Sequence, residues 1–349
     1  METDGRIGWQ DKLSRRSAVS GQTTGLTVAV LDHPFANLDV ERRVLGALGA
    51  TVVDAQVTTE AECRAICRQA DAVLVRRCPL PRVVIEAMER CTIICNYGAG
   101  YDNVDVDAAT QRGIMVANTR DYGDEEVADH TLMLLLALAR RLAPQLNALC
   151  AVAEGSRPVA WSHTPYVPVR RLSRQVLGIV GLGRIGQCLA RKARGIGLRV
   201  IAADPLVPAS VAAELGVAVL PLAEALAQAD FVSIHTPLLP ATRHLIGAAE
   251  FASMRPSAYL INCARGPIVD QQALLLALRA GQLAGAALDV LDEEPPSPEA
   301  LREILALPMV LVTPHIAWYS EESVADRQRL AAETVAQALR GQRPASVVN

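Results

Sequence analysis

Three glycines at the spacing G-x-G-x-x-G, Gly181, Gly183 and Gly186, are the residues that point most directly to a ligand. They follow an apolar run, Val176 to Val180, which is typical of a buried parallel strand, and they open a helix-like stretch. The first glycine permits a tight turn, the second lets the backbone approach a pyrophosphate, and the third lets helix and strand pack closely. The N–H groups of the helix's first turn then face the phosphates. In this context the pattern predicts a dinucleotide site rather than a purely structural turn.

A second apolar run, Arg199 to Ala203, ends in Asp204. A carboxylate after the second strand can accept hydrogen bonds from the hydroxyl groups of an adenosine ribose. The same carboxylate repels a 2′-phosphate, and Pro205 and Leu206 supply no compensating arginine. We therefore expect NAD rather than NADP to be the cofactor.

Three further strand ends carry polar residues that together could transfer a proton and bind an anion. Arg265 follows an apolar strand and could hold a carboxylate through two hydrogen bonds, although an arginine here could also cap a turn. His315 follows the run Val310–Val312 and could act as a general acid or base, or be a structural histidine. Glu294 lies in an acidic run that could be only a solvated loop. Together the three residues form the set needed for hydride transfer to a 2-oxo acid.

The chain resembles the D-isomer-specific 2-hydroxyacid dehydrogenases from about Leu26 onward. Several family-like motifs occur in the same order as in that family, which makes a chance match untenable. The motifs span residues 98–105, 180–186, 235–238, 262–266, 289–295 and 313–315.

The resemblance implies a role for individual residues. It implies that Arg265 binds the substrate carboxylate, that His315 donates and accepts the proton, and that Glu294 is its partner. It places Asp289 near the nicotinamide amide. The cofactor-binding set that it implies is Gly181, Gly183, Arg184, Ile185, Gly186, Asp204, His235, Thr236, Pro237, Cys263, Ala264 and Asp289. The substrate-binding set is Arg76, Tyr97, Gly98, Ala99, Gly100 and Trp318, with the backbone amides of Ala99 and Gly100 binding the substrate carboxylate.

Residues 315–321 and 124–129 are similar to the branch that contains the C-terminal binding proteins, which are transcriptional corepressors with a dehydrogenase fold. Those proteins carry an arginine just before the glycine loop, where this chain has Asn96. The missing positive charge could come from Arg76 or Arg77 instead, which leaves the substrate preference open. Trp318 could line the substrate pocket or be an interface aromatic.

The composition argues against several other functions. The chain has 349 residues, with a formal net charge of −3 that suggests neither a nucleic-acid nor a membrane partner. Its 8 cysteines form no C-x-x-C pair, and the pairs Cys63/Cys67 and Cys91/Cys95 have no histidine cluster near them, so we expect buried free thiols rather than zinc ligands. No secretory signal is recognisable, and we therefore expect a cytoplasmic location.

Alternating strand and helix signals predict an α/β protein with two doubly wound parallel-sheet domains, Rossmann-like or flavodoxin-like, and a cleft between them. We expect residues 1–25 to be disordered. Residues 26–120 together with 317–349 would form a discontinuous substrate-binding domain, and residues 121–316 the NAD-binding domain. Between residues 143 and 174 the sequence suggests a loop rich in Pro, Ser and Arg.

The sequence thus predicts an NAD-dependent reductase that converts a small 2-oxo acid into the D-2-hydroxy acid. An NAD-sensing scaffold of the corepressor type is the alternative. Oxidation of formate or phosphite is a further one, which Glu294 disfavours because the formate-oxidising branch has an amide there. The apolar run Thr131–Ala139 should be buried on most sides of its helix. The resemblance implies a homodimer formed in this region, unless the 143–174 loop covers the second face within one subunit.

Overall fold

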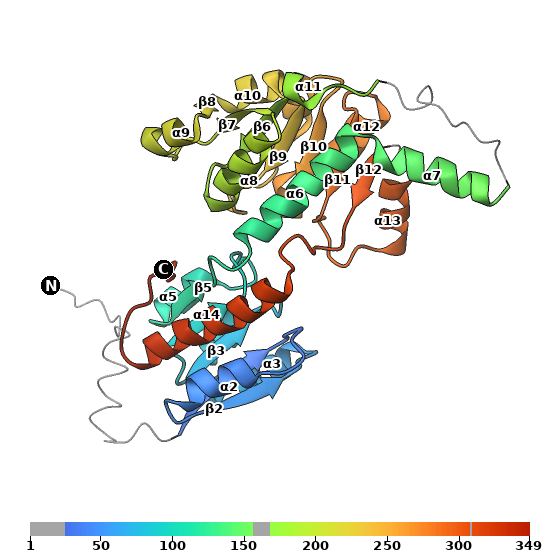
Figure 1. Ribbon diagram of the computed structural model, residues 1–349. Coiled ribbons are helices and arrows are strands. Elements are labelled where there is room, and N and C mark those ends of the chain that lie inside the picture. Colours follow the sequence, from blue (N-terminus) through green and yellow to red (C-terminus); the bar gives the residue numbers. More distant parts are fainter. Residues whose placement is uncertain (1–24, 156–167, 308) are drawn as a thin grey trace. The chain divides into compact units, whose positions relative to one another are not determined.

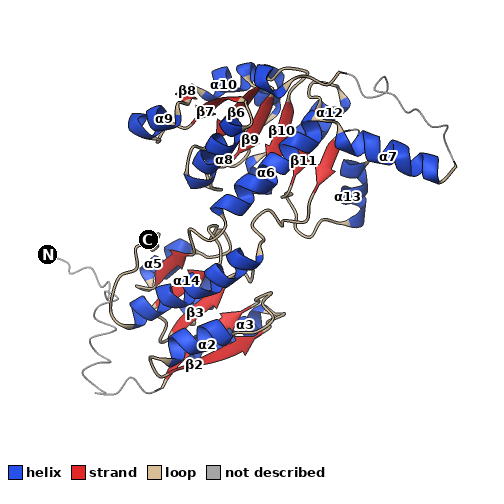
Figure 2. Cartoon of the chain, in the orientation of Figure 1, coloured by secondary structure: helices blue, strands red, loops and turns tan. Residues whose placement is uncertain are grey.

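The computed structural model describes residues 25–155, 168–307 and 309–349, so the expectation for residues 1–25 falls almost wholly outside the described residues. The chain divides into two compact units (Figures 1 and 2). The first contains residues up to Tyr122 and again from Ser320, and the second runs from Gly123 to Tyr319. These bounds lie two or three residues from those expected from the sequence.

The first unit is a five-stranded, wholly parallel sheet with the order β2-β1-β3-β4-β5. Helices α2 and α14 pack together, and a core on their side contains Leu38, Leu45 and Val335. A second core involves helices α3 to α5. The strands are β1 (Leu26–Leu31), β2 (Ala50–Ala55), β3 (Ala72–Val75), β4 (Ile93–Asn96) and β5 (Met115–Asn118), and the helices are α2 (Asp39–Gly46), α3 (Glu60–Gln69), α4 (Arg82–Glu86), α5 (Val106–Gln111) and α14 (Glu321–Leu339).

The second unit is a seven-stranded parallel sheet with the order β12-β11-β10-β9-β6-β7-β8. Its strand order reverses at β6, which lies between β9 and β7, and ligands of such sheets bind at this switch point. The strands are β6 (Val176–Val180), β7 (Arg199–Ala203), β8 (Ala218–Val219), β9 (Phe231–Ile234), β10 (Tyr259–Asn262), β11 (Gly285–Leu288) and β12 (Val310–Val312).

Helices cover this sheet as well. They are α6 (Asp124–Ala139), α7 (Leu142–Ala153), α8 (Arg184–Gly195), α9 (Ala209–Leu215), α10 (Leu222–Gln228), α11 (Ala248–Ser253), α12 (Gln271–Arg279) and α13 (Pro298–Leu305), with the short 3-10 helices η2 (Leu172–Arg174) and η3 (Gly266–Ile268). Because helices bury both faces of a parallel sheet, its strands are continuous apolar runs rather than alternating ones. All five residues of β6 are buried, for example.

The expected loop between residues 143 and 174 is wrong at its beginning, because residues 142–153 form helix α7. Alanine and leucine dominate this segment, and both are strong helix formers. Pro144 lies in the first turn, where its missing N–H group costs no hydrogen bond. Residues 156–167 lie outside the described part of the chain.

Helix α6 buries part of the run Thr131–Ala139 within its own unit, and the homodimer stays a prediction. Its residues Leu134 and Leu135 are 2% and 0% exposed and belong to the core of the second unit. The helix packs against α8 and against β10 and β11, so its own chain covers most of its apolar surface. Met133 is the half-exposed large apolar residue of the run.

Among the described residues no single helix is long and apolar enough to cross a membrane, although the bent pair α6 and α7 together passes by length and composition.

Candidate active site

The glycine loop follows β6, and each of its three positions has a different steric environment that explains why glycine is present. Gly181 has a positive φ of 95°, and a Cβ there would lie 2.8 Å from the carbonyl carbon of His235. A Cβ on Gly186 would lie 2.3 Å from the oxygen of Gly181. A Cβ on Gly183 would meet no atom within 4 Å, so this position borders open space. Gly181 and Gly186 are therefore required by the turn and by the close helix contact. Gly183, between them, leaves room for a ligand next to the backbone.

Asp204 and Arg184 hold the two ends of this loop. The Asp204 carboxylate follows β7 and accepts hydrogen bonds from Leu182 N at 2.7 Å and Leu206 N at 2.8 Å. Arg184, the first residue of α8, pairs through Nε with Asp124 Oδ2 at 2.6 Å. Ile185 packs against the core of the unit. Asp204 thus shapes the loop and retains lone pairs for further hydrogen bonds.

The end of β9 carries buried polar atoms that fit a bound cofactor. His235 Nε2 lies 2.8 Å from Ser233 Oγ, and burial lowers the pKa of His235 to about 4, so the ring is neutral at physiological pH. His235 Nδ1 and Thr236 Oγ1 are buried and have no hydrogen-bond partner in the described structure. Buried polar atoms are normally paired, so these two indicate where a ligand's polar groups belong. They flank the turn of Gly181, and the residues present therefore fit NAD.

Pro237, Cys263 and Ala264 complete the cofactor-binding set expected from the sequence. The Pro237 carbonyl accepts a hydrogen bond from Thr242 Oγ1 at 2.6 Å. Cys263 directly follows β10, and burial raises its pKa to about 12, so the thiol stays protonated. Ala264 N donates to Asn262 Oδ1 at 3.0 Å. These contacts shape the carboxyl ends of β9 and β10.

Arg265 is positioned by backbone contacts. Its carbonyl accepts a hydrogen bond from Asn262 Nδ2 at 2.9 Å, and its Nη1 donates to the Ala264 carbonyl at 2.8 Å. A Cβ on Gly266 would lie 2.0 Å from the oxygen of Leu291, so the chain after Arg265 packs directly against the acidic segment. This close approach requires a glycine and brings the segments that carry Arg265 and Glu294 together.

His315 and Glu294 form a direct pair. His315 Nδ1 lies 2.5 Å from Glu294 Oε2, and each side chain is 25% exposed. The other carboxylate oxygen, Glu294 Oε1, accepts from Leu291 N at 3.2 Å. His315 has a positive φ of 53°, an uncommon conformation that the surrounding contacts must maintain. With Nδ1 held by the carboxylate, Nε2 is the nitrogen left to exchange a proton with a substrate.

Asp289 supplies the contacts that hold the His315 segment. Its Oδ1 accepts from Thr313 Oγ1 at 2.6 Å and from Ile316 N at 3.0 Å, and its Oδ2 accepts from Ala317 N at 2.9 Å. The main-chain N–H of His315 donates to the Asp289 carbonyl at 2.8 Å. The structure therefore shows Asp289 orienting the histidine, a role that the sequence did not suggest.

His130 was missed by sequence reasoning. It lies on α6, and its Nε2 is 3.0 Å from Thr313 Oγ1 and 3.6 Å from Asp289 Oδ1. Burial lowers the pKa of His130, and the nearby Asp289 carboxylate opposes this. No sequence signal connects these residues, because they are 183 positions apart in the chain.

Trp318 supports the segment that carries His315 from its C-terminal side. Its indole Nε1 donates to the His315 carbonyl at 3.0 Å, and its ring packs edge-on against Tyr319. A Cβ on Gly123 would lie 3.4 Å from the Trp318 carbonyl oxygen. Within the second unit Trp318 thus supports the backbone of His315, and its expected substrate contact stays a prediction.

In the first unit, the Gly98–Gly100 loop follows β4 and is held by hydrogen bonds. Gly98 N donates to Asn96 Oδ1 at 2.9 Å, and Asn118 Nδ2 donates to the Ala99 carbonyl at 2.6 Å. The N–H groups of Ala99 and Gly100 make no hydrogen bond to the described residues. Two adjacent free amides are the donors that an anion requires.

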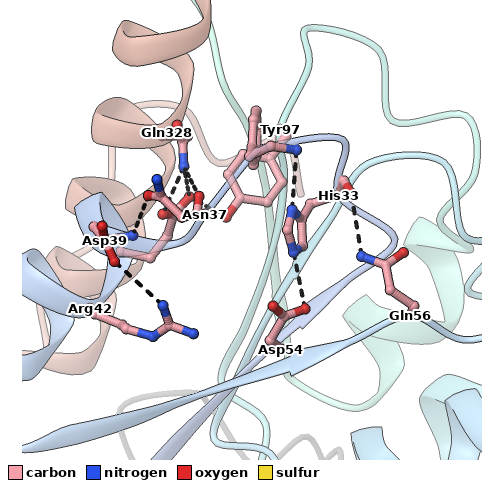
Figure 3. A network of polar contacts seen from close by, with 10 residues as sticks. His33, Asn37, Asp39, Arg42, Asp54, Gln56, Tyr97 and Gln328 are labelled. Carbon is pink, nitrogen blue, oxygen red and sulfur yellow. Dashed lines mark hydrogen bonds and ion pairs between the residues drawn. The ribbon is translucent and has the colours of Figure 1, made fainter.

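Tyr97 requires a correction, because its side chain cannot contact a substrate. It is fully buried, and its hydroxyl donates to Glu41 Oε1 at 2.7 Å, while Gln328 Nε2 donates to Glu41 Oε2 at 3.0 Å (Figure 3). Burial raises the pKa of Glu41. Tyr97 therefore anchors the start of the Gly98–Gly100 loop to the core of the first unit. The sequence could not distinguish a residue that lines a site from one that supports it.

Comparison with known proteins gives the family. A model of the D-isomer specific 2-hydroxyacid dehydrogenase NAD binding domain matches residues 132–317. This chain belongs to that family. It is 40% identical over 271 residues to glyoxylate reductase of Korarchaeum cryptofilum, covering 78% of this chain and 80% of the relative. It is 38% identical over 309 residues to D-3-phosphoglycerate dehydrogenase of Methanocaldococcus jannaschii, covering 88% of this chain but only 57% of that protein.

Solved structures agree with this membership. The TT0316 protein from Thermus thermophilus matches with a TM-score of 0.79 and 32% identity, covering 93% of this dehydrogenase-family chain and 100% of that one. D-lactate dehydrogenase from Aquifex aeolicus, complexed with NAD and lactic acid, matches with a TM-score of 0.78 and 26% identity, covering 90% and 96%. The family places the chain among NAD-dependent oxidoreductases of 2-hydroxy acids, with NAD as the cofactor.

Proposed function

We propose that this family member reduces a small 2-oxo acid to the D-2-hydroxy acid with NADH. The observation that carries the proposal is the His315–Glu294 pair at 2.5 Å on the sheet that bears the glycine loop. A histidine held by a carboxylate is a candidate general acid whose orientation is set.

The residues of the second unit divide the chemistry among them. Bound NADH supplies a hydride to the substrate's C2. Arg265 binds the substrate carboxylate and stabilises negative charge on the carbonyl oxygen. His315 donates the proton from Nε2 to that oxygen, which becomes the hydroxyl group. Glu294 holds Nδ1 of the imidazole and keeps the ring oriented.

A panel of 2-oxo acids tests the reaction. We expect NADH oxidation, followed by its absorbance, with at least one short 2-oxo acid, and chiral analysis should identify the D-2-hydroxy acid. His315→Gln should reduce kcat by about 10²–10⁴-fold while leaving NADH binding nearly intact. An NAD-sensing scaffold of the corepressor type would instead bind NADH and reduce no member of the panel.

We also propose that two copies associate through α7. Leu142, Leu146 and Leu149 are 45%, 52% and 47% exposed, and their spacing puts them on one stripe of the helix. No residue of α7 is buried within its own unit. A second copy would cover the stripe, which moves the expected interface from the core residues of α6 to this neighbouring helix.

A cytoplasmic location is part of the proposal. All eight cysteines are free thiols, which is typical of a reducing compartment. Cys63 Sγ and Cys67 Sγ lie 4.0 Å apart in the core of the first unit.

A further inference from the structure

Helix α6 brings a histidine to the strand ends that carry the His315 segment. His130 lies on α6, and 15% of its side chain is exposed. Its Nε2 lies 3.0 Å from the hydroxyl oxygen of Thr313 and 3.6 Å from Asp289 Oδ1. Only the first of these distances is that of a hydrogen bond, so the Thr313 hydroxyl links the histidine to the carboxylate. All of these residues belong to the second unit.

The direction of each hydrogen bond follows from the atoms present. The Thr313 hydroxyl carries one hydrogen, which it donates to Asp289 Oδ1 at 2.6 Å. If the hydroxyl donated to His130 instead, two oxygen atoms would lie 2.6 Å apart with no hydrogen between them. His130 Nε2 is therefore the donor to Thr313 Oγ1. Burial lowers the pKa of His130, which favours a neutral ring with its hydrogen on Nε2.

This chain of hydrogen bonds ends on the carboxylate that holds the backbone around His315. Asp289 Oδ1 also accepts from Ile316 N at 3.0 Å, and its Oδ2 accepts from Ala317 N at 2.9 Å. His315 has a φ of 53°, a conformation that a residue other than glycine keeps only when its surroundings hold it. Each donor in such a chain polarises the next, so the histidine of α6 strengthens the bond that reaches the carboxylate.

We propose that His130 is a positioning residue for the proton donor, because it fixes the Thr313 hydroxyl on Asp289 and so keeps the His315 segment in its conformation. The inference rests on the proposed reduction of 2-oxo acids. Asp289 holds the backbone directly, and His130 acts on it only through Thr313. No proton transfer to the substrate is assigned to His130.

Variants of the histidine and of the threonine test this role. His130→Leu and Thr313→Val should each slow the single-turnover oxidation of NADH by a 2-oxo acid about twofold to tenfold, the usual effect of one hydrogen bond, while the Kd for NADH stays nearly unchanged. His130→Gln should restore most of the rate, because its amide nitrogen can donate to the same hydroxyl. Met133→Leu is the control, since Met133 is exposed on the same helix, and its rate should match that of the unchanged protein.

The double variant shows whether His130 acts through Thr313. Once Thr313→Val has broken the chain, His130→Leu should slow the reaction no further. An equal slowing in both backgrounds would show that His130 acts independently of Thr313, which overturns the proposal. Thermal unfolding identifies a variant that fails to fold, and the tautomer of His130 in the unchanged protein then decides.

Two measurements do not depend on turnover. Long-range proton–nitrogen spectra of protein with isotope-labelled histidine should show His130 as the neutral tautomer with its hydrogen on Nε2, and His130→Gln identifies its signals. A hydrogen on Nδ1 instead overturns the proposal. Hydrogen–deuterium exchange at the amides of Ile316 and Ala317 should be faster in His130→Leu than in Met133→Leu, because their bonds to the carboxylate weaken.

Each outcome bears on a separate claim. If 2-oxo acids are reduced and folded His130→Leu reacts as fast as the unchanged protein, the positioning role is overturned and the proposed function stands. If no 2-oxo acid is reduced, the proposed function is overturned. In that case the tautomer and the exchange rates decide whether His130 holds the His315 segment, and equal exchange in His130→Leu and the control shows that it does not.

Discussion

At the scale of single residues, a hydrogen bond of 2.5 Å between His315 Nδ1 and Glu294 Oε2 determines what the imidazole can do. It fixes the ring and directs Nε2 toward proton exchange. Asp289 then fixes the backbone on both sides of the histidine through Thr313, Ile316 and Ala317. The acidic run that could have been only a solvated loop therefore supplies the hydrogen-bond partner of His315.

Glu294→Gln tests the pairing. The variant replaces a charge-assisted hydrogen bond with a neutral one, so the imidazole should be held less firmly and kcat for the 2-oxo acid should fall. The measurement is kcat for the 2-oxo acid together with KM for NADH, which should stay nearly unchanged. An unchanged kcat in the variant would contradict the pairing. Glu293→Gln, one residue earlier, is the control, and its kcat should match that of the unchanged protein.

The cofactor preference depends on Asp204. Its carboxylate accepts from Leu182 N and Leu206 N and repels a 2′-phosphate, so we expect a clear preference for NADH over NADPH. Asp204→Asn removes the charge but keeps one acceptor oxygen, and it should narrow that preference. Initial rates at matched concentrations of the two cofactors measure it. Equal or faster turnover of the unchanged protein with NADPH would refute the assignment.

At the scale of elements, the end of β9 and the glycine turn form one packed unit. Gly181 lies against the His235 backbone, and the imidazole is neutral because burial lowers its pKa to about 4. Because the buried imidazole stays neutral, His235 acts as a hydrogen-bonding residue rather than as a charged one. The buried Nδ1 has no hydrogen-bond partner among the described residues and can accept or donate one bond to a ligand.

The stability of the second unit should fall in acid because of His235. The unfolded chain binds a proton near pH 6.5, whereas the folded chain binds it only near pH 4. The unfolding free energy should therefore decrease as the pH falls from about 6.5 to about 4, by at most about 3 kcal/mol. Urea unfolding across this range, compared between the unchanged protein and His235→Gln, measures it. Parallel pH dependences in the two proteins would show that His235 does not cause the loss.

At the scale of the whole molecule, α7 carries the proposal of a dimer. Leu146→Arg puts a charge on its apolar stripe, where burial against a second copy would be costly, and it should yield a monomer. Asn147→Arg places the same charge on another side of the helix and should leave the dimer intact. Light scattering gives the mass of each, and a single-chain mass for the unchanged protein at all concentrations would reject the dimer.

Leu135→Arg tests the corrected role of α6. Because Leu135 is 0% exposed inside the second unit, a charge there should destabilise the fold by several kcal/mol rather than only separate two subunits. Thermal unfolding followed by circular dichroism distinguishes the two cases. If the Leu135→Arg variant were a folded monomer of unchanged Tm, Leu135 would belong to the dimer interface.

The sequence alone determined the family, the alternating fold and the His315, Glu294 and Arg265 set, because these depend on local patterns: apolar strands, glycine spacing and polar residues at strand ends. Which residues hold the site residues in place could be learned only from the tertiary structure. Tyr97 and Asp289 form buried hydrogen bonds, His130 contacts Thr313 from another helix, and Arg327 of the last helix stacks on Phe35. Their partners are distant in sequence, and a side chain's direction depends on the packing around it.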